Sequence, residues 1–189
     1  MSKNTISQKK YEKGFTMVET LVAIFILLIS ITGPMAIAQS GLRSAFFSKD
    51  QTTAFYLAQD AIEYIKNKRD NNFVNQFRNP ASSDWLSGII SGSGPVSITI
   101  DSIQDEIEYC PLGVGCSLSN PLKINQYGEY GFGGDSTKFS RLITINKIND
   151  DEISVVVKIE WDTGVLAGIR SIEVKENMFK WYDTYNIIP

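Results

Sequence analysis

The chain begins with a short polar segment and then becomes almost continuously apolar. From Thr20 to Leu42 there are 23 residues without a charge. As a helix this stretch would be roughly 34 Å long, which is enough to cross a hydrocarbon core of about 30 Å. A buried core helix is usually shorter and carries a polar face. The pattern therefore predicts a membrane-spanning helix over about residues 20–42.

Gly33 and Pro34 interrupt this apolar segment near its middle. Proline has no N–H to bond the carbonyl of Ser30, and its ring crowds that carbonyl. We therefore expect the helix to kink at Gly33 and Pro34.

Helical periodicity continues beyond the predicted span. Apolar side chains recur there at three- and four-residue steps. The positions concerned are Leu42, Phe46, Ala54, Leu57, Ala58, Ala61, Ile62 and Ile65. We expect one helix over residues 15–72, ending in the cluster at 69–72, because basic residues and asparagines suit a helix C-terminus. The stripe from Ala54 to Ile65 should then form part of the core of a head domain.

After residue 72 the apolar pattern changes to a period of two, which is typical of strands. The strand candidates are residues 96–100, 122–126, 139–145, 153–161 and 170–175. The last three follow one another across turn signals and predict an antiparallel meander that covers the helical stripe. The sequence therefore predicts an α+β fold, in which a long N-terminal helix packs on a C-terminal antiparallel sheet in a head of residues 73–189. Two glycine-rich segments, 88–94 and 128–134, are expected to be surface loops.

Positive charge is concentrated ahead of the apolar segment. The lysines concerned are Lys3, Lys9, Lys10 and Lys13. They should remain in the cytoplasm, because positive charge next to a first span resists translocation. We therefore expect a single-pass protein of the inner (cytoplasmic) membrane, with a cytoplasmic N-terminus and an extracytoplasmic head.

The remainder of the chain is acidic, with 14 basic and 20 acidic residues after Gly14. It lacks the dense basic cluster that a nucleic-acid backbone requires, so nothing in the sequence supports nucleic acid as a partner. The chain contains no histidine, which is the commonest general base and metal ligand. It also lacks nucleophile motifs and a phosphate-binding loop. We therefore expect no enzyme activity, no small-molecule substrate, no cofactor and no metal site, and we interpret the acidic segments 101–108 and 149–152 as solvated turns.

A basic front followed by an apolar run is also the pattern of a secretory signal peptide. Two features oppose that interpretation. The apolar run does not end in a small-residue A-x-A site, and a carboxylate, Glu19, lies at its start. A charge at the centre of a membrane costs about 2.5 to 3.5 kcal/mol, so an ionisable residue in a span is a functional candidate by default.

The segment Gly14-Phe15-Thr16-Met17-Val18-Glu19, with Lys13 before it and the apolar run after it, resembles the type IV pilin and type II secretion pseudopilin superfamily. The resemblance implies that a prepilin peptidase removes a leader of residues 1–14, cuts between Gly14 and Phe15, and N-methylates Phe15. It also places Thr16 and Glu19 in the positions that act in filament assembly. The apolar run itself is most similar to those of minor pilins and adaptor pseudopilins.

The function implied by the resemblance is structural. The expected chain is a minor pilin or pseudopilin of a type IV pilus or type II secretion pseudopilus. Its expected partners are the prepilin peptidase/N-methyltransferase, other pilin or pseudopilin subunits, the membrane and an assembly platform protein. The alternative is a single-span anchored binding or adhesin module that does not polymerise.

Cys110 and Cys116 are the only cysteines and enclose a glycine-rich segment in the part expected outside the cytoplasm. An even count in an oxidising location favours a disulfide between them. For so small a ring, chain entropy gives at most about 2 kcal/mol of stabilisation.

Overall fold

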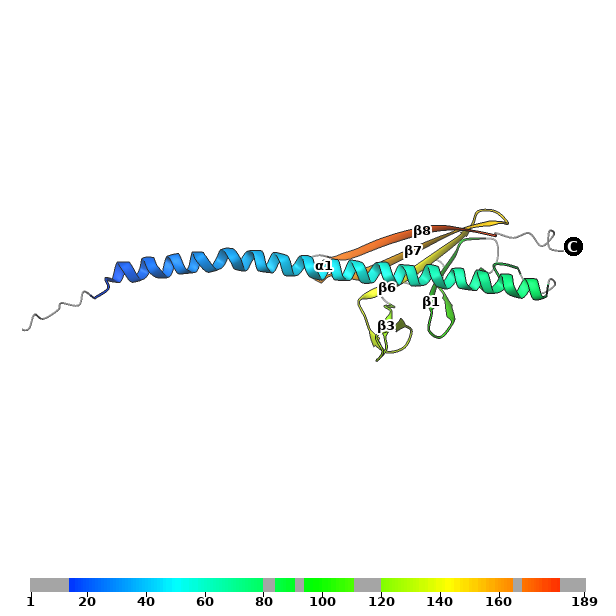
Figure 1. Cartoon of the computed structure of the whole chain (residues 1–189), viewed down its shortest axis with the longest axis horizontal. Helices are drawn as coiled ribbons and strands as arrows, with labels where there is room; N and C mark the ends of the chain where they lie inside the picture. Colours follow the sequence, from blue (N-terminus) through cyan, green and yellow to red (C-terminus); the bar gives the residue numbers. More distant parts are fainter. Residues whose placement is uncertain (1–13, 80–83, 91–93, 111–119, 165–167, 181–189) are drawn as a thin grey trace, which may run out of the picture. The chain divides into compact units, whose positions relative to one another are not determined.

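The computed structural model describes residues 14–79, 84–90, 94–110, 120–164 and 168–180. The chain divides into two compact units, Met1–Phe46 and Phe47–Pro189. One helix, α1 (Met17–Arg78), contributes to both units (Figure 1). Within the second unit an antiparallel sheet accompanies the helix, so the predicted α+β fold with a long N-terminal helix and a β-sheet head is confirmed.

The helix ends later than the sequence predicts. Instead of stopping at residues 69–72 it continues to Arg78. Asn72, which was expected to end the helix, instead binds the segment that follows it. Its side-chain amide donates to the carbonyls of Trp85 (3.1 Å) and Ser87 (2.7 Å). With its side chain held by the following segment, Asn72 is one more helical residue.

The main sheet of the head has five antiparallel strands in the order β2-β1-β6-β7-β8. Their bounds are Val96–Asp101 for β1, Glu106–Tyr109 for β2, Phe139–Lys147 for β6, Glu152–Asp162 for β7 and Ile169–Phe179 for β8. The three longest are consecutive and antiparallel, as the alternating pattern predicts. A smaller sheet, in the order β4-β3-β5, is formed by Lys123–Ile124 (β3), Tyr130–Gly131 (β4) and Asp135–Ser136 (β5).

The core of the head lies between one face of α1 and one face of the main sheet. The helix contributes Ala54, Leu57, Ala58, Ala61, Ile62, Tyr64 and Ile65, which includes the predicted stripe. The sheet contributes alternate residues, because successive side chains of a strand point to opposite faces. On β7 these are Ile153, Val155, Val157, Ile159 and Trp161. The period of 3.6 in the helix and the period of two in the strands thus meet in one apolar layer.

The two glycine-rich segments differ from the expectation of simple surface loops. Leading into the first of them, Trp85 and Leu86 are buried, and so is Ile89 within it. Gly88 separates them with a φ of +74°, a left-handed conformation that glycine adopts without steric cost. In the second, Tyr130 packs edge-on against Phe139 with ring centroids 6.2 Å apart. Ile89 is therefore a core residue, and Tyr130 is a partly buried residue packed against the core.

Candidate functional site

The helix begins at Met17, directly after a threonine that caps it. The N–H of Glu19 donates to the side-chain oxygen of Thr16 at 3.3 Å, and the N–H of Thr20 donates to the Thr16 carbonyl at 3.2 Å. Threonine at the N-cap with glutamate three residues later is the T-x-x-E pattern of a capping box. From the sequence, Thr16 was predicted to act in assembly alone. The spacing from Thr16 to Glu19 was the signal that would have revealed its second role.

The bond between Gly14 and Phe15 lies in non-helical chain, ahead of the cap. Phe15 is exposed, and a Cβ placed on Gly14 would meet no atom within 4 Å. Within the described residues, the space around position 14 therefore does not require glycine. A requirement for glycine would come from a protein that binds this segment. The leader up to residue 13 lies outside the described residues.

The first part of α1 has an apolar surface on all sides. Its most apolar 18-residue window has a mean hydropathy of 2.5, and none of that window is buried within the structure. Among the described residues this is one helix long and apolar enough to cross a membrane. Side chains such as Leu21, Phe25 and Ile29 are each more than half exposed. In water this surface would be strongly unfavourable, so it needs lipid or other apolar helices around it.

Gly33 and Pro34 lie inside α1, which continues through them as a helix. The hydroxyl of Ser30 donates to the Leu27 carbonyl at 2.8 Å, and that of Thr32 donates to the Ile29 carbonyl at 3.0 Å. Hydroxyls bonded in this way satisfy polar groups inside an apolar segment. The kink at Gly33 and Pro34 stays a prediction.

Glu19 is exposed at the start of the apolar surface, and Thr16 and Phe15 are close to it in the chain. The structure thus places Gly14, Phe15, Thr16 and Glu19 within one short segment. This segment combines an accessible peptide bond, a helix cap and a carboxylate. Cys110 is buried at the end of β2, while Cys116 lies outside the described residues, so their disulfide stays a prediction.

The head contains a buried arginine on the strand β6. Arg141 on β6 is 1% exposed. Its Nη1 donates to the carboxylate of Asp60 at 2.7 Å and to the Leu57 carbonyl at 3.1 Å, and its Nη2 donates to the Ile100 carbonyl at 2.6 Å. Burial lowers the pKa of the guanidinium, and the hydrogen bond to Asp60 opposes that change. The signal for this pair was a charged residue in an otherwise apolar alternation, which requires a buried partner.

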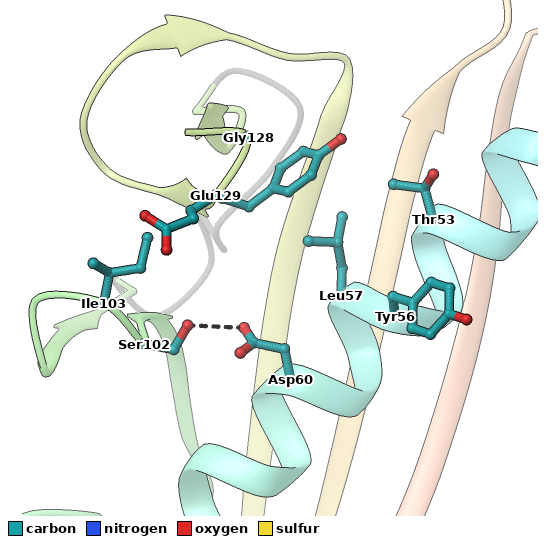
Figure 2. Close-up of a pocket in the computed structure, with 9 residues that line it drawn as sticks. Thr53, Tyr56, Leu57, Asp60, Ser102, Ile103, Gly128 and Glu129 are labelled. Carbon is teal, nitrogen blue, oxygen red and sulfur yellow. Dashed lines mark hydrogen bonds between the residues drawn. The ribbon is translucent and has the colours of Figure 1, made fainter. Parts of the chain in front are cut away.

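Asp60 also lines a cavity of about 480 Å³ on the head (Figure 2). The walls come from α1, from the turn after β1 and from the hairpin before β4. Ser102 donates its hydroxyl to Asp60 across this cavity at 3.1 Å. Because Asp60 is already paired with Arg141, its charge is neutralised within the head. The cavity therefore presents no free charge from Asp60 to a ligand.

The turn between β1 and β2 is fastened to the helix by a second carboxylate. Asp105 accepts hydrogen bonds from the hydroxyl of Tyr64 at 2.9 Å and from Lys68 at 2.8 Å. The hydrogen bond from Lys68 is the main cause that lowers the pKa of Asp105, whereas burial and the bond to Asp105 raise the pKa of Tyr64. Asp105 has a φ of +58°, which costs less for aspartate than for most residues.

Asp101, at the end of β1, is fully buried, which corrects its interpretation as part of a solvated turn. One carboxylate oxygen accepts the N–H groups of Ile103 and Gln104 at 3.0 Å each, and the other accepts the N–H of Phe132 at 2.7 Å. The carboxylate thereby joins the turn after β1 to the small sheet. Position 131 requires glycine while Asp101 keeps its position, because a Cβ there would collide with the Asp101 carboxylate.

Comparison with known proteins gives one match. Residues 9–33 match the family model of the prokaryotic N-terminal methylation motif. Among curated proteins and solved structures, none matches the chain significantly. The matched residues include the Gly14–Phe15 bond, the Thr16 cap, Glu19 and the first part of the apolar helix. The chain therefore carries the prepilin signature of the type IV pilin and pseudopilin superfamily.

Proposed function

We propose that the chain is a minor pilin or pseudopilin, a structural subunit of a type IV pilus or type II secretion pseudopilus. The observation that carries this proposal is the combination of the methylation motif with a helix whose first part has no buried residue. Such a helix needs apolar surroundings both before and after assembly. A membrane supplies them first, and the helices of other subunits supply them in a filament.

In this proposal a prepilin peptidase cuts between Gly14 and Phe15 on the cytoplasmic side and methylates Phe15. The leader of residues 1–14 is removed, the chain from Phe15 to the end of α1 at Arg78 forms the helical stem, and the sheets that follow form the body of the head. The head lies outside the cytoplasm, because the lysines before the span stay inside. The remaining partners are an assembly platform protein and neighbouring subunits.

Cleavage also creates a new ammonium group on Phe15 near the membrane edge. Glu19 of a neighbouring subunit can neutralise this ammonium in the filament, which converts two costly charges into a hydrogen-bonded pair. Incorporation of each subunit would then depend on the alignment of its N-terminus with the carboxylate of its neighbour.

The competing function is an anchored binding or adhesin module that never polymerises. The cavity beside Asp60 is the feature that such a module would use. We favour the structural subunit, because the motif specifies processing, which a plain anchor does not need.

Processing can be tested by co-expressing the full chain with a prepilin peptidase. We expect the chain to become shorter by 14 residues, with Phe15 as its methylated N-terminus, as measured by intact-mass spectrometry and N-terminal sequencing. Gly14→Val should block the cut. Gly41→Val is the matched control, because a Cβ at either glycine meets no atom of the folded chain. A wild-type chain that stays uncut and monomeric would favour the anchored module.

A further inference from the structure

The strand β8 forms one outer edge of the main sheet (Figure 1). Its eleven residues pair with β7 in an unbroken register, from Ile169 opposite Asp162 to Phe179 opposite Glu152. In the described part of the chain no strand pairs with its other side. An edge of this kind presents a row of N–H and C=O groups that can bind another strand.

The side chains along this edge include exposed apolar and charged groups. Ile169 is 62% exposed and Phe179 is 51% exposed, at the two ends of the strand. Glu173 and Lys175 are exposed near its centre, and neither makes an ion pair within the described residues. The lysine opposite Glu173 on β7, Lys158, pairs with Glu160 instead.

These groups complement one another when β8 is paired antiparallel with a second β8 about Val174. In that register Glu173 of each copy lies opposite Lys175 of the other, and Ile169 lies opposite Phe179. Each of these cross-strand pairs occurs twice because of the two-fold symmetry. Opposite charges and apolar pairs at directly opposed positions stabilise an antiparallel ladder. The edge is therefore complementary to itself in one orientation.

A parallel arrangement does not have this property. In a parallel, in-register pair Glu173 would face Glu173 and Lys175 would face Lys175, and like charges at opposed positions are destabilising. A parallel pair shifted by two residues forms a single Glu173–Lys175 pair and separates the terminal apolar residues. Charge thus disfavours lateral sheet growth between subunits that point the same way.

The direction of β8 decides which molecules can meet at this edge. Within the head, Arg170 near the start of β8 stacks over Phe47, and Glu176 near its end forms an ion pair with Lys66. The strand therefore runs in the same direction as the helix beside it. Two heads that are oriented the same way present parallel β8 strands, so antiparallel pairing requires two heads that point in opposite directions.

We propose that β8 is a self-association edge, which pairs antiparallel with β8 of a second copy that points the opposite way. The contact would join the two main sheets into one continuous sheet with the helices of both heads on the same face. In the proposed filament it would connect two subunits through their heads, apart from the contacts that the apolar helices make. The pairing itself needs neither cleavage nor polymerisation.

The test uses the full chain purified in detergent, with its self-association measured by sedimentation. Glu173→Lys and Lys175→Glu each place like charges opposite one another at both symmetric positions. We expect either variant alone to weaken self-association on the order of tenfold. A mixture of the two variants, and the doubly exchanged variant, should restore it. Circular dichroism of each variant checks that the head remains folded.

Orientation is tested separately with Ile169→Cys and Phe179→Cys. In the antiparallel pair these positions are opposite each other, so a short bismaleimide should cross-link a mixture of the two variants more efficiently than either one alone. A wild-type chain that stays monomeric, or an association that the charge exchanges leave unchanged, would overturn the proposal. Preferential cross-linking of each variant to itself would also overturn it. None of these results depends on processing, so the proposed function is tested independently.

Discussion

At the scale of single residues, the head contains a positive charge in its core. Arg141 has three hydrogen-bonding partners, and its Nε has none among the described residues. A buried guanidinium remains protonated, so its stability in the core depends on Asp60. The side chain of Asp60 is 39% exposed, and water therefore screens part of the interaction.

We expect Asp60→Asn to lower the free energy of unfolding by about 2 kcal/mol, less than the loss of a partner in a fully buried ion pair. Replacing both residues, in Asp60→Asn with Arg141→Met, should cost less than Asp60→Asn alone, because no buried charge is then left unpaired. Urea unfolding of the wild type, Asp60→Asn, Arg141→Met and the double variant, followed by the fluorescence of buried Trp85 and Trp161, completes the double-mutant cycle. Additive effects would show that the pair is not coupled.

The fastening of the β1–β2 turn should depend on pH. The pKa of Asp105 is lowered in the folded chain, chiefly by its hydrogen bond from Lys68. Its contribution to stability is therefore fully present above the unfolded pKa of about 3.9 and is lost as the pH falls through the lower, folded pKa. Amide exchange of residues 102–105 should accelerate over that acidic range. In Asp105→Asn, amide exchange of the same residues should be fast at neutral pH as well. Wild-type exchange that did not depend on this loss of charge would contradict the role of Asp105 in holding the turn.

At the scale of elements, the sequence predicted those helices and strands whose apolar residues recur at a regular spacing. The helix and the strands β6, β7 and β8 follow from the 3.6- and two-residue patterns, because each presents one apolar face to the same core. The short strands and the helix end were less predictable. The end of α1 depends on a contact from Asn72 to Trp85, and such a contact is invisible in local composition.

In the candidate site, too, residues that are close in the chain were predictable from the sequence, and residues that folding brings together were not. Gly14, Phe15 and Glu19 could be predicted from the sequence because they lie within one short segment of the chain. The pair of Arg141 and Asp60 joins residues 81 positions apart, so only the folded chain brings it together. Buried Asp101 was missed for a related reason, since its partner Phe132 directly follows β4 and lies 31 positions along the chain.

The predicted disulfide involves Cys110, which directly follows β2. The N–H of Cys110 donates to the Ser97 carbonyl at 2.8 Å, so this cysteine is fixed against β1. We expect non-reducing peptide mapping of the full chain to find Cys110 linked to Cys116. Replacing both cysteines by serine should lower stability by at most about 2 kcal/mol, because the ring is small. Two free thiols in a chain exported to an oxidising compartment would refute the bond.

At the scale of the whole molecule, Glu19 is expected to act only after insertion and cleavage. Glu19→Gln keeps the length of the side chain and removes its charge, so insertion and removal of the leader should proceed as in the wild type. Its incorporation into filaments should fall strongly, because the N-terminal ammonium of a neighbour would lack its partner. Immunoblots of sheared filaments against membrane fractions measure this ratio.

Glu19→Asp is the matched control for that experiment, since it retains the carboxylate and should retain part of the incorporation. Normal levels of Glu19→Gln in filaments would remove the carboxylate from assembly. Loss of cleavage in the same variant would instead assign Glu19 to recognition by the peptidase.

The exposed apolar surface of the first part of α1 bears on whether a subunit can pass reversibly between the membrane and the filament. Lipid tails and packed apolar helices are nearly equivalent solvents for such a surface, so exchanging one for the other changes the hydrophobic free energy little. In the proposed filament, the hydrophobic free energy would then be nearly the same before and after a subunit enters the filament. The few polar groups at the start of the helix would decide the direction, and modest external work could drive the same subunit out of the membrane and back again.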